Sequence, residues 1–191
     1  MLLHDDLGSD LTQIGRLIEI AERHAETPAA LSAQLQQLRQ VTDRAKGGMG
    51  HLLWALKPEC DNLESLVSLI VRYAGEFFEP WDIRLRLDVP EAVPPLVLST
   101  EARYGFFLAM KETFNNIVRH AQATEVRISL ALSKAEWKLT IQDNGCSFDP
   151  TSKATGNGLY NIRKRIDAFG GNVEFIASRG KGTKVVFVMK C

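Results

Sequence analysis

The sequence predicts an α+β protein in two parts, a helical hairpin over residues 1–57 and an α/β sandwich over residues 58–191. Heptad spacing of apolar residues in the first part is typical of helices that pack along a continuous seam. In the second part, stretches with helical periodicity are separated from stretches of alternating polarity. This segregation of helices and antiparallel strands predicts a single sheet covered by helices.

The first part is expected to form two long helices, separated by a break at Thr27 and Pro28. The residues that recur at alternating steps of four and three are Leu7, Leu11, Ile14, Ile18, Ala21 and Ala25, and then Leu31, Leu35, Leu38, Thr42, Ala45, Met49 and Leu52. Two helices of this size cannot bury both seams within one chain. We therefore expect a homodimer whose two hairpins form a four-helix bundle. The alternative is a single hairpin docked on the second part.

Pro58 is expected to end the second helix, because proline lacks an amide hydrogen and clashes with the preceding turn. The elements expected after it are a helix over 63–79, a strand over 83–89, a helix over 101–120, strands over 126–132 and 137–141, a helix near 157–169 and a final hairpin ending near residue 189. Alternation in the first strand directs Arg84, Arg86 and Asp88 outward.

The composition argues against several classes of protein. The 23 basic residues are balanced by 23 acidic ones, which disfavours a nucleic-acid partner. No signal peptide is present, and no apolar run approaches the roughly twenty residues that span a bilayer, so a soluble, cytoplasmic segment is expected. Cys60, Cys146 and Cys191 are odd in number and form no CxxC pair, which argues against a disulfide framework or a zinc site.

The helix over 101–120 carries polar residues that suit a metal and phosphate site. Glu112, Asn116 and His120 are four residues apart and are expected on one face. The carbonyl oxygen of asparagine is a hard ligand suited to Mg²⁺, which prefers few protein ligands together with phosphates and water. A carboxylate one turn away can orient the water shell of the ion or a nucleophile. A solvated helix face has the same spacing, so this pattern alone decides nothing.

Three glycine-containing stretches follow. Residues 143–145, Asp-Asn-Gly, come where a strand ends. A buried aspartate there can accept the exocyclic amine of adenine, and the glycine lets the backbone turn away without a Cβ clash; the alternative is an ordinary hairpin turn. Residues 156–159, Gly-Asn-Gly-Leu, open a helix, where backbone amides and the helix dipole favour a phosphate. Residues 180–183, Gly-Lys-Gly-Thr, precede the last strand.

Together, in this order and spacing, the four stretches resemble the N, G1, G2 and final glycine boxes of the GHKL ATPases, which include histidine kinases, type II topoisomerases, mismatch-repair proteins and heat-shock chaperones. The resemblance covers about residues 62–190 and implies a Bergerat-type fold that binds ATP with Mg²⁺. It implies that Asn116 binds Mg²⁺, that Asp143 contacts adenine and that Thr183 supports the adenine end. The other nucleotide-site residues it implies are His120, Gly145, Gly156, Gly158, Leu159 and Gly182.

The chain departs from the family pattern at one position of the G1 box. Ser147 stands where the second glycine is usual, and a positive φ there would cost on the order of 1 kcal/mol. The segment over 148–155 is short, so a short lid over ATP is expected.

The first helix opens with Leu-His-Asp-Asp-Leu-Gly over residues 3–8, which places His4 at the edge of the apolar stripe and directs Asp5 outward. A neutral histidine nitrogen can attack phosphorus, and a neighbouring carboxylate can hold the tautomer or accept the proton. This string, ahead of a hairpin and a GHKL domain, resembles the nitrate-sensor (NarX/DesK-like) class of sensor histidine kinases. The resemblance implies that His4 is phosphorylated, that Asp5 is its base and that Glu112 is an electrostatic helper near Mg²⁺.

The function implied is ATP-dependent autophosphorylation of His4 and transfer of the phosphoryl group to an aspartate of a response-regulator receiver domain. An upstream sensor, anchored in the inner membrane, is expected in the full-length protein. Ser9 stands where relatives often carry a glutamine that serves dephosphorylation of the regulator. Two other functions stay open: a nucleotide-binding pseudokinase module, which Ser147 favours, and an ATPase that hydrolyses ATP to drive clamping, which has no use for His4 and Asp5.

Overall fold

The computed structural model describes residues 12–21, 31, 35, 36, 38, 39, 42, 61–146, 158–177 and 182–190. The chain divides into two compact units, Met1–Lys57 and Pro58–Cys191. In the first unit the described residues are helical, and the heptad residues Ile18, Leu31 and Leu35 are 41%, 40% and 52% exposed. The hairpin and its four-helix dimer stay predictions. Among the described residues, none of the helices has both the length and the apolar character that a membrane span requires.

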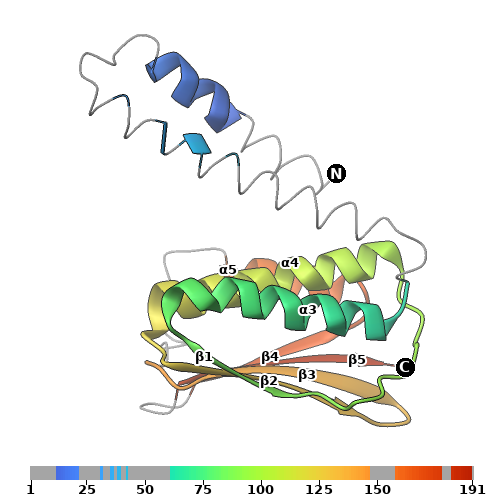
Figure 1. Cartoon of the computed structure of the whole chain (residues 1–191). Helices are drawn as coiled ribbons and strands as arrows, with labels where there is room; N and C mark the ends of the chain where they lie inside the picture. Colours follow the sequence, from blue (N-terminus) through green and yellow to red (C-terminus); the bar gives the residue numbers. More distant parts are fainter. Residues whose placement is uncertain are drawn as a thin grey trace. The chain divides into compact units, whose positions relative to one another are not determined.

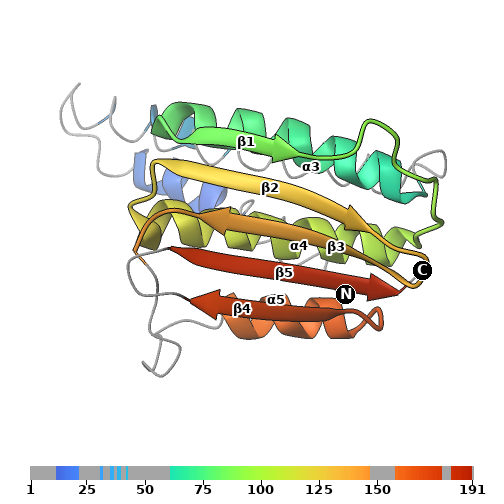
Figure 2. The same ribbon diagram turned by 90° about the horizontal axis from the view of Figure 1, so that it is seen from below.

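The second unit is a five-stranded sheet, in the order β1-β2-β3-β5-β4, with three helices on one face (Figure 1). Its elements are α3 (Leu63–Phe78), η2 (Glu79–Trp81), β1 (Arg84–Asp88), α4 (Thr100–Asn116), η3 (Ile117–Ala121), β2 (Glu125–Leu132), β3 (Glu136–Asp143), α5 (Gly158–Asp167), β4 (Asn172–Ala177) and β5 (Thr183–Lys190). The view from below shows the opposite face of the sheet free of helices (Figure 2). The α/β sandwich and the elements expected for residues 63–190 are confirmed.

The helices begin where the sequence supplies capping residues. The Asn62 side chain accepts a hydrogen bond from the Ser65 amide at 2.8 Å, and the Ser99 hydroxyl accepts one from the Ala102 amide at 3.1 Å. Each bond satisfies an amide that has no partner within the helix. Glu64 lies in the first turn of α3, where its charge complements the helix dipole. These caps fix where α3 and α4 begin.

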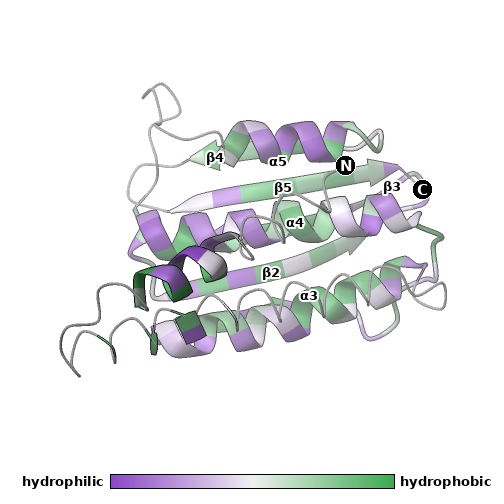
Figure 3. Ribbon diagram, turned by 90° about the horizontal axis from the view of Figure 1, so that it is seen from above, coloured by the Kyte–Doolittle hydropathy of each residue, from purple (hydrophilic) through white to green (hydrophobic). Residues whose placement is uncertain are grey.

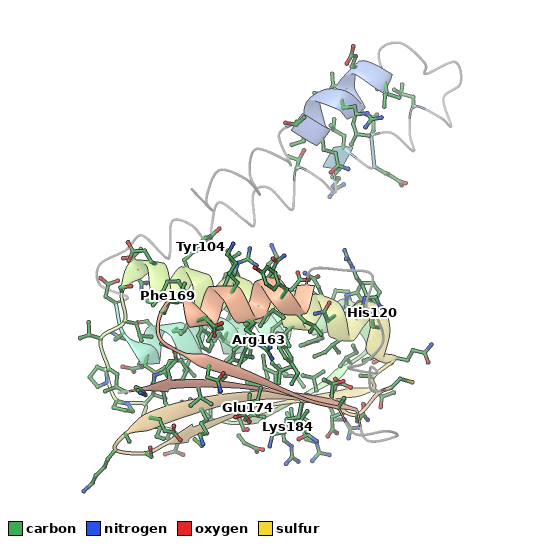
Figure 4. All side chains as sticks on the ribbon, turned by 180° about the vertical axis from the view of Figure 1, so that it is seen from behind. Tyr104, His120, Arg163, Phe169, Glu174 and Lys184 are labelled. Atoms are coloured by element: carbon green, nitrogen blue, oxygen red, sulfur yellow. The ribbon has the colours of Figure 1, made fainter. Side chains whose placement is uncertain are left out.

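The central strands bury alternate residues against the helices. The buried hydrophobic side chains of β2 and β3 are Val126, Ile128, Leu130, Trp137, Leu139 and Ile141. Hydrophobic residues lie along β5 beneath the helices, and hydrophilic bands mark the outward side of α5 (Figure 3). Glu174 and Lys184 project from the face that no helix covers (Figure 4). The period of two therefore separates a buried face from a polar one.

One strand differs from the expected arrangement. β1 pairs with β2 in parallel, with Arg84 opposite Glu125 and Asp88 opposite Ser129. The pairs β2–β3, β3–β5 and β4–β5 are antiparallel, as expected. A parallel pair needs a crossover of a dozen or more residues, and α4 provides it between β1 and β2. The expectation of a wholly antiparallel sheet was therefore wrong for β1.

Aromatic rings join the helices to one another and to the sheet. The fully buried Phe114 of α4 has ring centroids 4.7 Å from Phe78, 5.7 Å from Phe77 and 6.1 Å from Tyr73 of α3. Burial, and to a lesser extent the charge of Glu76, raises the pKa of Tyr73 to about 12, so its ring stays un-ionised at neutral pH. This cluster holds α4 in place beside α3.

Replacing Phe114 with alanine should lower the free energy of unfolding by about 3–5 kcal/mol, because it removes a buried ring that three others contact. Urea denaturation followed by tryptophan fluorescence measures this change. Val97→Ala is the control, because Val97 is 85% exposed and its loss should change stability by less than about 0.5 kcal/mol. Equal effects of the two substitutions would contradict this description of the core.

Candidate functional site

Polar and glycine residues from four elements meet at one end of the second unit. β3 ends there with Asp143, β5 begins with Thr183, α4 ends with Asn116 and α5 begins with Gly158. Figure 2 shows the tip of β3 and the start of β5 beside the yellow-green end of α4. Residues far apart in the sequence are thus brought to a single place.

Asp143 is buried, as the sequence predicted, with only 3% of its surface exposed. The Gly145 amide donates a hydrogen bond to Asp143 Oδ1 at 2.9 Å, and the backbone amide of Thr183 donates another to the carboxyl group. Burial raises the pKa of Asp143, while these amide hydrogen bonds act in the opposite direction. The result is a carboxyl group whose position is fixed from two sides.

Gly182 lies directly against the backbone of Asp143. A Cβ atom at residue 182 would overlap the Asp143 carbonyl oxygen and lie 2.8 Å from Oδ1. Gly182 also has a φ of +77°, a conformation that side-chain-bearing residues rarely adopt. Glycine is therefore required here for two independent reasons.

Glu112 and Asn116 approach the start of α5. A Cβ atom on Gly158 would lie 2.6 Å from Glu112 Oε1 and 3.7 Å from Asn116 Nδ2. The structure thus brings together the carboxylate, the amide and the helix start that the sequence assigned to a metal and phosphate site. Gly158 leaves room for both side chains, in addition to its expected place at a helix N-terminus.

The donor set at this point fits Mg²⁺. Asn116 and Glu112 offer oxygen ligands from adjacent turns of one helix, and both are partly exposed. In the part of the chain that the structure describes, no group of three His, Cys, Asp or Glu side chains could enclose a metal. Mg²⁺ keeps several waters and takes few protein ligands, so a site of this kind is sufficient when phosphates supply the remaining oxygens.

His120 follows Asn116 by four residues and lies in η3, and its place on one face with Glu112 and Asn116 stays a prediction. After Asn116, α4 continues as the π-helical turn η3, which hydrogen-bonds to the fifth residue rather than the fourth. The His120 side chain is exposed at the end of α4 (Figure 4).

The end of η3 is joined to the loop after β3. The Cys146 amide donates a hydrogen bond to the Ala121 carbonyl oxygen at 2.6 Å, and a Cβ atom on Gly145 would overlap that same oxygen. The sequence indicated that Gly145 avoids a clash but gave no sign that Ala121 is the partner. No local motif marks Ala121, because the contact joins residues more than twenty positions apart.

The remaining predicted site residues divide into two groups. Leu159 lies partly exposed in the first turn of α5, and Thr183 is the partly exposed first residue of β5. His4, Asp5, Ser9, Ser147 and Gly156 lie outside the described residues.

Residues 103–191 match the family described as histidine kinase-, DNA gyrase B- and HSP90-like ATPases. Over these residues the chain is similar to those ATPases. After this similarity, the second unit is called the ATPase domain below.

The chain is also similar over almost its whole length to sensor kinases. It is 29% identical to the signal transduction histidine-protein kinase/phosphatase UhpB of Salmonella typhimurium, over 96% of this chain and 36% of that protein. It is 24% identical to the sensor histidine kinase LiaS of Bacillus subtilis, over 96% of this chain and 50% of that protein. The nitrate/nitrite sensor protein NarX of Escherichia coli is 24% identical, over 96% of this chain and 31% of its own length. The chain therefore spans half or less of each of these relatives.

Solved structures share the fold. The histidine kinase domain of a blue-light activated histidine kinase from Erythrobacter litoralis superposes with a TM-score of 0.61 at 14% identity, covering 95% of this chain and 94% of that one. The Acinetobacter baumannii histidine kinase AdeS superposes with a TM-score of 0.58 at 18% identity, covering 98% and 96%.

The two close-packed glycines should respond differently to alanine. Gly145→Ala places a methyl group against the Ala121 backbone, which cannot rotate away, and should destabilise the domain by about 1–3 kcal/mol. Gly158→Ala meets the end of the Glu112 side chain, which can turn aside, and should lower thermal stability less. Thermal unfolding of both variants tests this order, and a larger loss for Gly158→Ala would contradict the packing at Gly145.

Proposed function

We propose that this chain is the kinase core of a sensor histidine kinase, which binds ATP with Mg²⁺, phosphorylates itself on His4 and passes the phosphoryl group to an aspartate of a response regulator. The observation that carries the proposal is the meeting of Asp143, Asn116, Glu112 and Gly158 at one end of the ATPase domain. The similarity to sensor kinases over 96% of the chain supports it.

In this proposal each described residue has a separate task. The Asp143 carboxylate accepts a hydrogen bond from the exocyclic amine of adenine, and Gly145, Gly182 and Thr183 hold it in position. Asn116 would supply a ligand to Mg²⁺, which when bound would offset the negative charge of the phosphates. Glu112 stands one turn earlier and orients groups around the metal without activating a hydrolytic water. The start of α5 at Gly158 presents backbone amides to a phosphate.

In this proposal the first unit supplies the residues that react in the phosphoryl transfer. A neutral ring nitrogen of His4 attacks the γ-phosphorus, the bond between that phosphorus and the bridging oxygen breaks, and ADP leaves with the electron pair. Asp5 accepts the ring proton. The product then donates its phosphoryl group to a carboxylate of the receiver domain.

The exposed heptad residues of the first unit support a homodimer. Ile18, Leu31 and Leu35 are each at least 40% exposed in the single chain, so the seams have apolar surface left to bury. We propose that two hairpins close this surface in a four-helix bundle. The full-length protein would carry an upstream sensor anchored in the inner membrane, with this core on the cytoplasmic side.

Replacing Asp143 with alanine should abolish ATP binding measured by calorimetry, because the buried acceptor for the adenine amine is lost. Asp88→Ala is the matched control, since Asp88 also ends a strand but is exposed and pairs with Arg127 at 3.5 Å on the uncovered face. Thermal melts of both variants verify folding. Unchanged affinity in folded Asp143→Ala would refute the adenine contact.

Replacing His4 with glutamine should eliminate the acid-labile, alkali-stable label that forms on incubation with γ-labelled ATP, while the affinity for ATP stays unchanged. Glutamine keeps a polar side chain of similar length but has no nucleophilic ring nitrogen. Label that persists would move the acceptor to His24, His51 or His120. ATP binding without any label in the wild type would favour a pseudokinase module, and release of free phosphate would favour a clamping ATPase.

A further inference from the structure

Asn144 follows the buried Asp143, and its side chain makes three hydrogen bonds to Thr124 and Glu125. Its Oδ1 accepts from the amides of Thr124 and Glu125, each at 2.9 Å. Its Nδ2 donates to the Thr124 hydroxyl at 2.9 Å, and its backbone amide donates to the Glu125 carbonyl at 3.2 Å. We call Asn144, Thr124 and Glu125 together the Asn144 clamp.

The clamp joins three strands where they meet at the functional end of the sheet. β3 ends at Asp143, opposite Val126, and Asn144 continues the pairing to Glu125 beyond that last register position. The Arg84 amide donates to the Thr124 carbonyl at 2.9 Å, which ties the start of β1 to the same segment. Thr124 and Glu125 lie just before and at the start of β2, beyond the last register position of β3, so the Asn144 side chain takes the place of a ladder bond.

The geometry points to Asn144 as a positioning residue that sets the base specificity of the nucleotide site. The Gly145 amide, which bonds Asp143 Oδ1, belongs to the peptide that follows Asn144, so its direction depends on how Asn144 is held. Beyond Gly145, the Cys146 amide bonds the Ala121 carbonyl at the end of η3. β5 holds the Asp143 carboxyl group through the Thr183 amide, and the clamp fixes the other side through the Gly145 amide. This inference rests on the proposed adenine contact of Asp143.

The three residues of the Asn144 clamp are exposed or partly exposed. Asn144, Thr124 and Glu125 lie at the surface, where they border a polar hollow with Arg84 and Asp82. Asn144 itself is exposed and buries little apolar area. Removing its side chain should therefore alter the direction of the Gly145 amide more than it alters the packing of the core. An exposed residue with this many backbone partners is expected to affect the orientation of Asp143 much more than global stability.

The test compares ATP with purine riboside triphosphate, which lacks only the exocyclic amine, by calorimetry with Mg²⁺ on the whole chain. The dissociation constant of purine riboside triphosphate divided by that of ATP reports the contribution of the exocyclic amine, and hence of the Asp143 contact. A hydrogen bond to a charged group predicts a ratio of about ten to one hundred in the wild type. Asn144→Ala should reduce this ratio to below about three while the thermal midpoint falls by only a few degrees.

Asn144→Asp is the conservative variant. Its carboxylate retains the acceptor for both amides, and the Thr124 hydroxyl can turn to donate to it, so the ratio should stay within about twofold of the wild type. The repulsion between the added charge and the triphosphate is the same for both nucleotides and cancels in the ratio. If Asn144→Ala does not fold, Asn144→Ser, whose shorter side chain reaches one amide, should give an intermediate ratio.

The outcomes separate the two proposals. A wild-type ratio near one would overturn the adenine contact of Asp143 and this inference with it. A high wild-type ratio that Asn144→Ala or Asn144→Ser preserves would overturn the positioning role of Asn144 and leave the nucleotide site intact. Equal losses in Asn144→Ala and Asn144→Asp would also overturn it, because the rescue by a retained acceptor would have failed.

Discussion

The functional end of the ATPase domain depends on one close approach between two backbones. Gly182 lies against Asp143 so closely that a Cβ atom would overlap the Asp143 carbonyl oxygen, and the φ of +77° at Gly182 directs the chain into β5. Because β5 begins at the next residue, this contact sets where the Thr183 amide meets the Asp143 carboxyl group. A side chain at residue 182 would separate β3 from β5 at the point where the polar residues gather. The strand pairing and the site therefore share a single steric requirement.

The end of α4 is adapted to the same place by a change of helix type. After Asn116 the chain continues through the π-helical turn η3 instead of another α-helical turn. Gln122 then adopts a left-handed conformation with φ of 51° before β2 begins. The Ala121 carbonyl is thereby left free to receive the Cys146 amide. The irregular turn thereby joins the helix to the loop that follows Asp143.

The sequence predicted the parts of the fold that depend on local pattern and missed those that depend on distant partners. Alternation in residues 126–132 and 137–141 placed β2 and β3 correctly, because burial of one face determines the period of two. The parallel pairing of β1 could not be deduced, since its partner lies beyond α4 and a short alternating run does not specify a direction. Asp143 and Gly182 were identified from their motifs, whereas the role of Asn144 was hidden by an Asp-Asn-Gly string that is also common in turns. The π-helical turn η3 could not be deduced, because the spacing of residues assumes a helix of constant pitch.

The buried carboxyl group of Asp143 explains why this end of the sheet is suited to a ligand. An ionised carboxylate can accept roughly four hydrogen bonds, and the protein supplies backbone amides from Gly145, Thr183 and Asp143 itself. These bonds favour the charged form, yet burial is the larger influence, so the pKa remains above its usual range. The protein alone therefore does not fully compensate the desolvation of the carboxylate. A donor that enters the site supplies the missing hydrogen bond and gains more from it than it would in water, because the surroundings have a low dielectric. The exocyclic amine of adenine is a donor of this kind, and a base that presents a carbonyl at the same position would place two acceptors against each other. In the proposed function, the buried carboxylate of Asp143 at the end of β3 would therefore favour a base that carries an amine at this position.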